Sequence, residues 1–310
     1  MQAQTGHGIP VDPTMPTMEQ RPFGATDLQV SVLGFGAGHI GSPASSDADA
    51  ARVLNAALDA GINLIDTARG YELSEERIGR LLSHRRDQFV LSTKVGYSVP
   101  GVPDWSAAAV TGGIDRALGQ LSTDTIDVCF LHSCGLDVLQ AGEAVDALRR
   151  AQEEGKVRVC GYSGEGAELE WAIESGAFGA IQTSVNLADQ WTATTLLPRA
   201  VEAGLGIIAK RPLANAAWRF EDRPVGRYEE PYWERLGVMG IEPADGDWIS
   251  TAIRFSAFVP GVSTAIVGTS SADNLRDVAD AVARGPLPAA EVERWAAAFA
   301  PHLGHWPPQV

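Results

Sequence analysis

Four polar side chains in this sequence stand at or near the ends of apolar runs, and together they could protonate a carbonyl group. Asp66 ends NLID, Lys94 follows FVLST, His132 ends IDVCFLH, and Tyr71 lies five residues after Asp66. A lysine behind an apolar run needs its charge paired, and Asp66 is the obvious partner. An ammonium beside a phenol favours the phenolate, which makes the phenol a better general acid. A nearby imidazole can orient the carbonyl oxygen or share its proton. This chemistry suits hydride arriving at the carbonyl carbon, and it needs no metal.

These residues converge only if the runs that carry them are neighbouring strands. From about residue 21, strand-like apolar runs alternate with amphipathic helical segments. The runs are too apolar for a half-exposed sheet, which predicts parallel strands buried on both faces. Strands are predicted over 30–36, 63–68, 89–95, 126–132, 157–164, 180–186, 206–213 and 263–269. Helices are predicted over 47–61, 74–85, 106–121, 137–155, 166–176, 192–204, 247–259, 271–285 and 289–303.

Strict alternation of this kind is typical of a doubly wound sheet or an eight-stranded barrel, and the length of 310 residues favours the barrel. We therefore predict an α/β fold, a (β/α)8 TIM barrel forming a single domain over residues 21–310, after a flexible extension over 1–20. A hairpin before the first strand is predicted to close the barrel floor. A long irregular segment, 214–246, follows the seventh strand and is either a lid over the substrate or an ordinary insertion. The C-terminal GHWPPQV is a candidate to fold back over the mouth.

Gly36, Gly38 and Gly41 match the spacing of the dinucleotide-binding fingerprint of Rossmann domains. That fingerprint needs a helix that starts at the third glycine, so that its amides meet a pyrophosphate. Here the best helix N-caps lie at 45–47, several residues too late. In a barrel the same glycines end the first strand, where Gly36 and Gly38 let the backbone approach a ligand closely. His39 then either faces the pocket or decorates the loop.

The composition argues against several classes of function. With 24 basic and 39 acidic residues the net charge is −15, which disfavours binding to nucleic acid or to an anionic membrane. The three cysteines form no CxxC pair, so neither a disulfide framework nor a zinc site is predicted. No apolar run approaches the length of a membrane span, and the first residues lack the features of a signal peptide. We expect a cytoplasmic protein without a metal, and the oligomeric state stays open.

The segments LIDTARGY, STKV, FLH, GYSG, IQTSVN and VGTSSADNL, in this order, resemble the aldo-keto reductase superfamily over about residues 21–300. The resemblance implies a barrel that binds NAD(P)H across its strand ends and reversibly reduces an aldehyde, ketone or sugar to an alcohol. It implies that Tyr71 donates the proton, that Lys94 and Asp66 tune it, and that His132 orients the substrate. It also implies a set of cofactor-binding residues. Ser163 and Gln182 would bind the nicotinamide carboxamide, and the others are Gly36, Arg211, Leu213, Gly268, Thr269, Ser270, Asn274 and Asp277.

The chain departs from the family pattern at several of these positions. Gly164 follows Ser163 where the family often has asparagine, and Arg211 stands where an aromatic ring is frequent. A planar guanidinium can also stack on a ring. Gly268 and Asn274 stand where basic residues are common, and only Arg276 lies nearby. We expect NADP(H) to be favoured over NAD(H), with weakened contacts to the 2′-phosphate.

Two other functions fit parts of the pattern. A Schiff-base aldolase could use Lys94 or Lys210 on the same barrel, but it would need neither the four-residue set nor an adenosine-phosphate loop. A non-catalytic nicotinamide-binding redox sensor would bind the cofactor without turnover. The identity of the small carbonyl or alcohol substrate depends on the loops, because one barrel hosts many chemistries.

Overall fold

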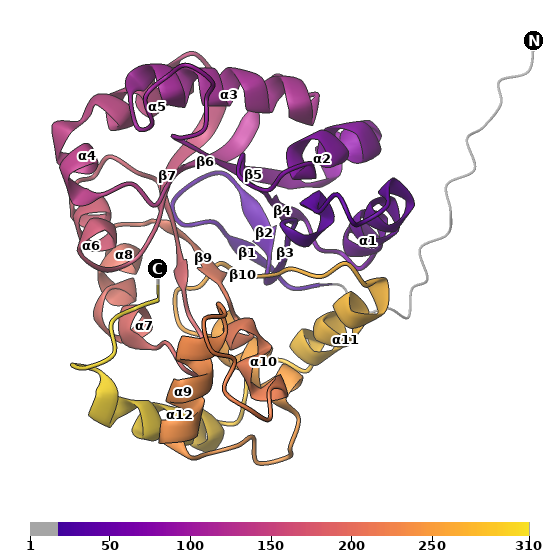
Figure 1. The fold of residues 1–310 in the computed structure, drawn as a ribbon, viewed down its shortest axis with the longest axis vertical. Coiled ribbons are helices and arrows are strands. Elements are labelled where there is room, and N and C mark those ends of the chain that lie inside the picture. The colour runs from indigo at the N-terminus through magenta and orange to yellow at the C-terminus, as the bar shows by residue number, and fades with distance from the viewer. Residues whose placement is uncertain (1–17, 310) are drawn as a thin grey trace, which may run out of the picture.

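The computed structural model describes residues 18–309, and eight parallel strands form a closed barrel at its centre (Figure 1). The strands are β3 (Leu33–Gly36), β4 (Leu64–Asp66), β5 (Val90–Val95), β6 (Ile126–His132), β7 (Val157–Ser163), β8 (Ala180–Ser184), β9 (Gly206–Lys210) and β10 (Thr264–Val267). They are ordered as in the sequence, and β10 pairs with β3 to close the ring. Each lies within a predicted strand, so the predicted (β/α)8 barrel is confirmed.

Helices surround the barrel and cover the outer face of its strands (Figure 1). Serine side chains cap several of them, as Ser46 does by accepting a hydrogen bond from the Asp49 amide. Among residues 18–309, no helix is long and apolar enough to cross a membrane. The longer helices are α1 (Asp47–Asp59), α2 (Ser74–Leu82), α3 (Ala107–Leu121), α5 (Glu143–Glu153), α6 (Gly166–Glu174), α9 (Glu230–Met239), α10 (Trp248–Ala257), α11 (Ala272–Ala283) and α12 (Ala289–Phe299).

Two helices that the sequence predicts as continuous are each broken in the structure. The predicted helix over 137–155 is divided into α4 (Leu136–Ala141) and α5, because Gly142 between them has a φ of 81°. The predicted helix over 192–204 is divided into α7 (Trp191–Thr195) and α8 (Leu197–Glu202). Pro198 lies in the first turn of α8, where its missing amide costs nothing, but it cannot continue the helix that precedes it.

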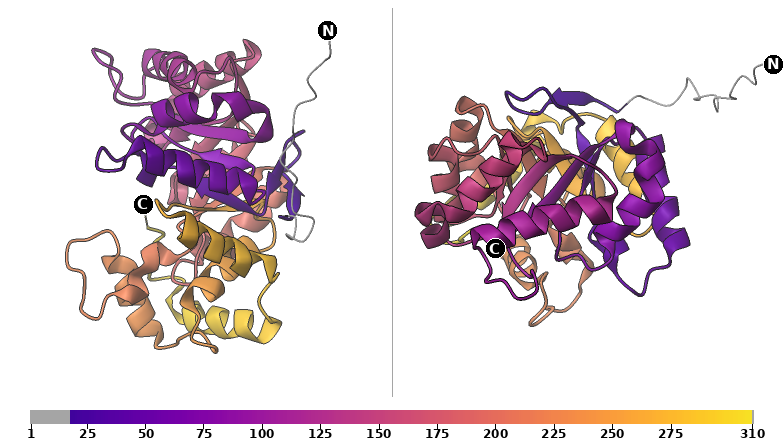
Figure 2. Two further views of the ribbon diagram at one scale, coloured as in Figure 1. Left: turned by 90° about the vertical axis from the view of Figure 1, so that its right-hand side faces the viewer. Right: turned by 90° about the horizontal axis from the view of Figure 1, so that it is seen from above.

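The predicted hairpin at the barrel floor is also present. β1 (Gln20–Pro22) pairs antiparallel with β2 (Gln29–Ser31), and Figure 2 shows this pair at the opposite end of the barrel from the loop that precedes α9 (Glu230–Met239). Phe23 and Val30 are fully buried in an apolar cluster that also contains Phe130 of β6. The hairpin therefore closes the floor with side chains. Of the extension predicted over 1–20, residues 1–17 lie outside the described residues.

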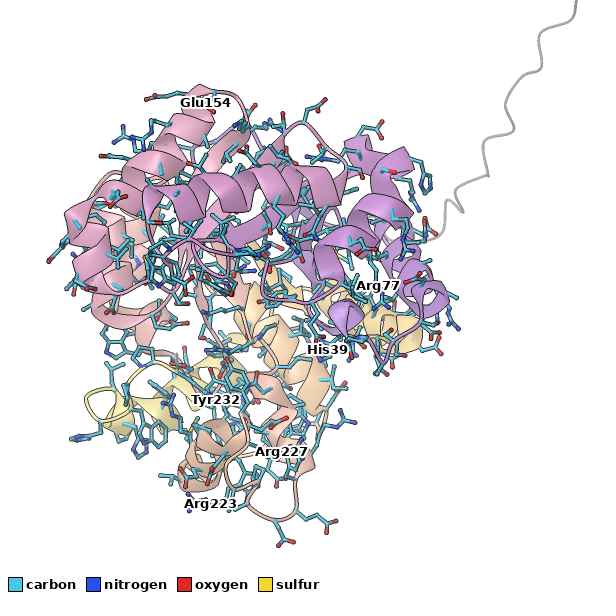
Figure 3. The ribbon with its side chains drawn as sticks, turned by 45° about the horizontal axis from the view of Figure 1, so that its top comes forward. His39, Arg77, Glu154, Arg223, Arg227 and Tyr232 are labelled. Atoms are coloured by element: carbon cyan, nitrogen blue, oxygen red, sulfur yellow. The ribbon has the colours of Figure 1, made fainter. Side chains whose placement is uncertain are left out.

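The segment predicted to be irregular, 214–246, contains the 3₁₀ turn η3 (Ala214–Arg219) and the helix α9. The sequence prediction missed this helix. Tyr232 on α9 points inward and is fully buried against a second apolar cluster with Trp295 and Phe299 of α12. Arg223 and Arg227, from the loop before α9, are exposed (Figure 3). Packing against α12 therefore holds the segment in place above the strand ends.

Candidate active site

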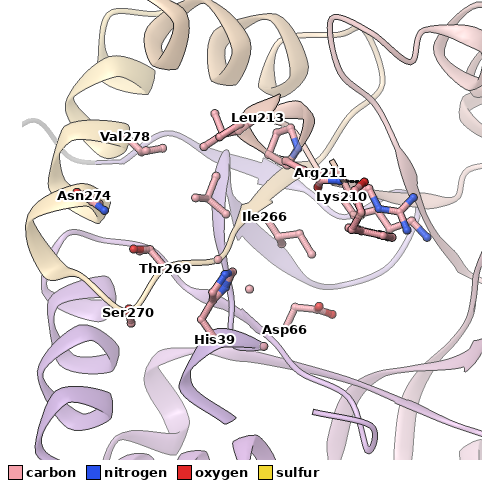
Figure 4. A pocket seen from close by; sticks show the side chains of 18 of the residues that line it. His39, Asp66, Lys210, Arg211, Leu213, Ile266, Thr269, Ser270, Asn274 and Val278 are labelled. Carbon is pink, nitrogen blue, oxygen red and sulfur yellow. Dashed lines mark hydrogen bonds between the residues drawn. The ribbon is translucent and has the colours of Figure 1, made fainter. Parts of the chain in front are cut away.

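A cavity of about 930 Å³ opens at the carboxyl ends of the barrel strands (Figure 4). Asp66, Tyr71 and His132 line it, and Lys94 lies buried behind them. All ten residues predicted to bind the cofactor also line this cavity, although they come from five different strand–loop segments. The η3 segment and its following loop add Asn215, Trp218 and Tyr228 to the lining. The segment after β9 thus forms part of the cavity wall.

A buried ion pair lies at the base of the cavity. The Lys94 ammonium is 2.6 Å from Oδ2 of Asp66 and donates a second hydrogen bond to the Thr67 carbonyl at 2.8 Å. Both charged side chains are almost completely buried. Burial lowers the pKa of Lys94, but the charge and hydrogen bond of Asp66, with further contributions from Tyr71 and Tyr97, together outweigh it, so the pKa is raised. Lys94 is therefore a permanent cation in this site.

Two further side chains hold the carboxylate of Asp66 in place. Ser92 of β5 donates a hydrogen bond to Oδ1 at 2.7 Å, and the Gln182 amide of β8 donates to the same oxygen at 3.0 Å. Ser163 in turn donates to the Gln182 side-chain oxygen at 3.1 Å. Ser163 and Gln182, predicted to bind a carboxamide, thus lie on the cavity wall and are also connected to Asp66.

Tyr71 lies beside this ion pair. The Lys94 ammonium is 5.2 Å from the centroid of the Tyr71 ring, and the His132 ring meets the Tyr71 ring edge-on at 6.2 Å. The third glycine of the fingerprint helps to position Tyr71, because a side chain at Gly41 would overlap the Tyr71 carbonyl oxygen. The Leu73 amide also donates to the Gly41 carbonyl at 3.1 Å. Gly41 therefore packs against the tyrosine loop, which explains a glycine there without a pyrophosphate.

The loop after β3 is fixed by Arg77, which the sequence prediction did not single out. This side chain reaches from α2 and is 4% exposed. It donates to the carbonyl of Ser42 at 2.8 Å and of Ser45 at 2.6 Å, and it pairs with Asp47 at 2.9 Å. Figure 3 shows Arg77 beside the loop that carries His39. Arg77 thus holds in place the loop on which His39 and Gly41 lie.

His39 faces the cavity, which decides between its two interpretations. It lines the cavity beside the loop after β10. A side chain built at Gly268 would approach Nδ1 of His39 to 2.7 Å. This contact favours glycine at position 268. Next to it, Thr269 and Ser270 lead into α11, and Ser271 caps that helix by accepting from the Asn274 amide at 3.2 Å.

Arg211 lines the cavity but is already engaged by its own chain. Its guanidinium donates to the Ser184 hydroxyl at 2.9 Å and to the Gln309 carbonyl, and it lies 4.9 Å from the centroid of the Tyr228 ring. The backbone N–H of Gln309 in turn donates a hydrogen bond to the buried Asp189 carboxylate at 3.0 Å. The C-terminal segment therefore does fold back to the cavity, where Arg211 and Asp189 hold it.

Lys210, the neighbour of Arg211, also lines the cavity and pairs with a buried acid. Its ammonium is 3.2 Å from Oε1 of Glu165, which also accepts hydrogen bonds from the Ser184 amide and hydroxyl. Burial lowers the pKa of Lys210, and the nearby positive charges of Arg211 and Lys94 add to the effect, while Glu165 opposes it. The sequence prediction did not include Glu165, because nothing in the sequence distinguishes it from other acidic residues that follow a strand.

His132 is neutral in this site. Burial and the nearby ammonium groups of Lys94 and Lys210 lower the pKa of His132 to about 3. Its Nδ1 is 2.8 Å from the hydroxyl of Tyr97, a residue that the sequence prediction did not include. A neutral imidazole carries one N–H donor and one acceptor nitrogen, so His132 can donate a hydrogen bond without being charged.

The lowered pKa of His132 makes the stability of the protein depend on pH. Below about pH 6.5 the unfolded chain protonates this imidazole and the folded protein does not, so the free energy of unfolding falls as the pH decreases towards 3. We expect His132→Asn to reduce the pH slope of the unfolding free energy by up to about 1.4 kcal/mol per pH unit. Denaturant unfolding of both proteins between pH 4 and pH 6 measures this slope, and equal slopes would show that His132 is protonated in the folded state.

The sequence is similar to those of known oxidoreductases. The sequence model described as the Aldo/keto reductase family matches residues 32–300. L-galactose dehydrogenase from Arabidopsis thaliana is 28% identical over 286 residues, which cover 86% of this chain and 89% of that protein. D-threo-aldose 1-dehydrogenase from a Pseudomonas species is 31% identical over 253 residues, 68% of this chain and 76% of that protein.

A solved structure agrees with these sequence matches. The holo form of the aldo-keto reductase AKR11C1 from Bacillus halodurans has a TM-score of 0.80 and 27% sequence identity, with coverage of 91% of this chain and 96% of that chain. The similarity thus extends over nearly the whole of both chains.

Proposed function

The chain belongs to the Aldo/keto reductase family of oxidoreductases, and from this premise we propose that it reduces a carbonyl substrate with NAD(P)H, using Tyr71 as the proton donor. The reverse reaction would oxidise the corresponding alcohol. The observation that carries the proposal is the buried pair of Lys94 and Asp66 beside Tyr71 at the base of the cavity. A buried ion pair is not a convincing source of stability by itself, because desolvation offsets much of its attraction. A role in tuning Tyr71 gives this pair a function.

The cavity has the features that a nicotinamide cofactor needs. Its volume of about 930 Å³ is near the upper end of the ~300–1,000 Å³ typical of small-molecule and cofactor sites. The backbone is open at Gly268, where a side chain would fill the space next to His39. The N-terminal amides of α11 lie behind Thr269 and Ser270, and such amides favour phosphate groups. Bound there, the reduced cofactor would supply hydride to the carbonyl carbon.

The residues of the chain would then supply the proton to the carbonyl oxygen and stabilise the negative charge left on the donor. The Tyr71 hydroxyl would give its proton to the carbonyl oxygen, and the resulting phenolate would be stabilised by the nearby Lys94 ammonium. Asp66 would keep Lys94 in place, as its contacts with Ser92 and Gln182 support. Neutral His132 would donate a hydrogen bond to the same carbonyl oxygen and orient it, which supports transfer to one face of the carbonyl.

A titration followed by a substrate panel tests this function. Tyrosine and tryptophan fluorescence would measure the affinity for NADPH and NADH, and the tighter binder would then be used with aldehydes, ketones and sugars. Two relatives are named for sugar substrates, so aldoses and their oxidation belong in the panel. We expect binding of a reduced nicotinamide and turnover of at least one carbonyl compound. Tight cofactor binding without any turnover would favour the redox sensor instead.

We further propose that NADP(H) is preferred over NAD(H), with Arg276 supplying the contact to the 2′-phosphate. Arg276 lies on α11, and within residues 18–309 its guanidinium pairs with one acid, the exposed Asp273, at 2.8 Å. Exposed pairs of this kind contribute little, so the guanidinium is available to a phosphate. We expect Arg276→Ala to weaken NADPH binding by roughly fivefold and to leave NADH binding unchanged. Arg284→Ala, at the other end of α11, is the matched control, and equal losses for both cofactors would refute the assignment.

The aldolase alternative is weakened at Lys94. A Schiff base requires a neutral amine, whereas the pKa of Lys94 is raised and its ammonium is held by Asp66 and Thr67. Lys210 is the remaining candidate, since its pKa is lowered and it lines the cavity. Borohydride trapping in the presence of a carbonyl substrate tests it, and the reductase proposal expects no covalent adduct on Lys210.

A further inference from the structure

Tyr97 contacts the imidazole of His132 through a hydrogen bond that none of the proposed roles explains. Its hydroxyl lies 2.8 Å from Nδ1 of His132, and the two rings are 5.4 Å apart between centroids. Among residues 18–309, Nδ1 is the one hydrogen-bond partner that the structure gives to this hydroxyl. His132 also lines the cavity in which the proposed substrate position lies.

The loop that carries Tyr97 is held firmly from two sides. Arg69 donates from its Nε to the carbonyls of Tyr97 and Ser98, at 3.2 and 3.1 Å. On the other side the Trp105 ring packs edge-on against the Tyr97 ring at 5.6 Å, and the Trp105 amide donates to the Gly96 carbonyl at 2.6 Å. Tyr97 therefore meets His132 from a fixed position and not from a mobile loop.

The protonation states of the two groups determine the direction of the hydrogen bond. Burial, with a contribution from Tyr71, raises the pKa of Tyr97, so its hydroxyl keeps its proton at neutral pH. The pKa of His132 is lowered to about 3, so the imidazole carries a single proton. If that proton were on Nδ1, the Tyr97 hydroxyl proton would lack its acceptor in the described structure. A hydroxyl that donates to Nδ1 keeps its acceptor, and the single imidazole proton is then on Nε2.

We propose that Tyr97 is a positioning residue that fixes His132 as the tautomer with its proton on Nε2, so that the ring presents a donor to the carbonyl oxygen. The contribution of this donor to reduction rests on the proposed function, whereas the tautomer itself does not. The same contact also prevents the ring from rotating, because a flip would replace Nδ1 by a carbon atom opposite the Tyr97 hydroxyl.

Nitrogen NMR and kinetics of the variant Tyr97→Phe test this proposal. With ¹⁵N-labelled histidine, and with His132→Asn to assign the signals, the unaltered protein should show Nδ1 as the acceptor and Nε2 as the protonated nitrogen. In Tyr97→Phe both nitrogens should shift towards values typical of a mixture of tautomers. We expect kcat to fall about 10-fold, at the low end of losses seen when a partner that orients a histidine is removed at metal sites. The affinity for the cofactor should not change.

Trp105→Phe separates positioning from general loop packing, because it removes the indole and keeps the Tyr97 hydroxyl. Its nitrogen spectrum should match that of the unaltered protein. A proton on Nδ1 in the unaltered protein, or an unchanged His132 spectrum in Tyr97→Phe, would overturn the proposal. Equal loss of kcat in both variants with unchanged spectra would also overturn it. If no carbonyl compound is reduced at all, the proposed function fails, and the NMR result still decides the role of Tyr97.

Discussion

Replacing Tyr71 by phenylalanine is expected to lower kcat for carbonyl reduction by about 100- to 10,000-fold, while the affinity for the nicotinamide cofactor stays nearly unchanged. The variant retains the ring that packs beside Gly38 and His132, and it loses only the hydroxyl that would donate the proton. Lys94 and Asp66 remain paired in the variant, so the fold should also be retained. Steady-state kinetics and a fluorescence titration with the cofactor measure the two quantities separately.

Tyr228→Phe is the matched control for this experiment. Tyr228 also lines the cavity, but it is half exposed and its ring packs on the Arg211 guanidinium. It takes no part in the proposed proton transfer. Removing its hydroxyl should change kcat little. If Tyr71→Phe kept most of its rate, another group would have to supply the proton, and the role assigned to Tyr71 would be wrong.

Replacing Lys94 by methionine is expected to lower the free energy of unfolding by about 3–5 kcal/mol as well as to abolish most activity. Methionine fills a similar volume, so the main loss is electrostatic: the Asp66 carboxylate stays buried without its cation. The Thr67 carbonyl also loses a hydrogen bond. Denaturant unfolding monitored by tryptophan fluorescence measures this loss.

The double variant Asp66→Asn/Lys94→Met separates stability from catalysis. It removes both charges, so no buried carboxylate is left unpaired, and part of the lost stability should return. Activity should stay low, because Tyr71 still lacks its ammonium. A double variant no more stable than Lys94→Met alone would show that the uncompensated charge is not the cause of the destabilisation.

The barrel was predictable because its signal is local. Each strand is an apolar run, and several of the longer helices have a serine or aspartate N-cap, so neighbouring residues already indicate much of the alternation. The helix predictions were wrong where a single residue ends a helix or where a contact with a distant segment stabilises one. Gly142 and Pro198 interrupt helical patterns that otherwise continue, and α9 is stabilised by Tyr232 packing against α12, some 60 residues further along the chain.

The convergence of the four central residues was also predictable, because parallel pairing brings the ends of adjacent strands together. Asp66 pairs in register with Ser92, and Lys94 with Phe130, so their side chains reach one rim of the barrel. Tyr97, Glu165 and Gln309 could not be found in this way. Their positions depend on loop conformations and on contacts between distant segments, which a single sequence does not encode in any local pattern.

The anchoring of Gln309 has a practical consequence for how the enzyme is produced. An affinity tag fused to the carboxyl terminus would begin one residue beyond a backbone that Arg211 and Asp189 hold against the cavity. Such a fusion would pull on the rim of the substrate entrance, and kinetic values from that preparation would include this disturbance. A purification handle placed before β1 joins the described part of the chain at the barrel floor, where β1 and β2 separate that point from the reaction centre.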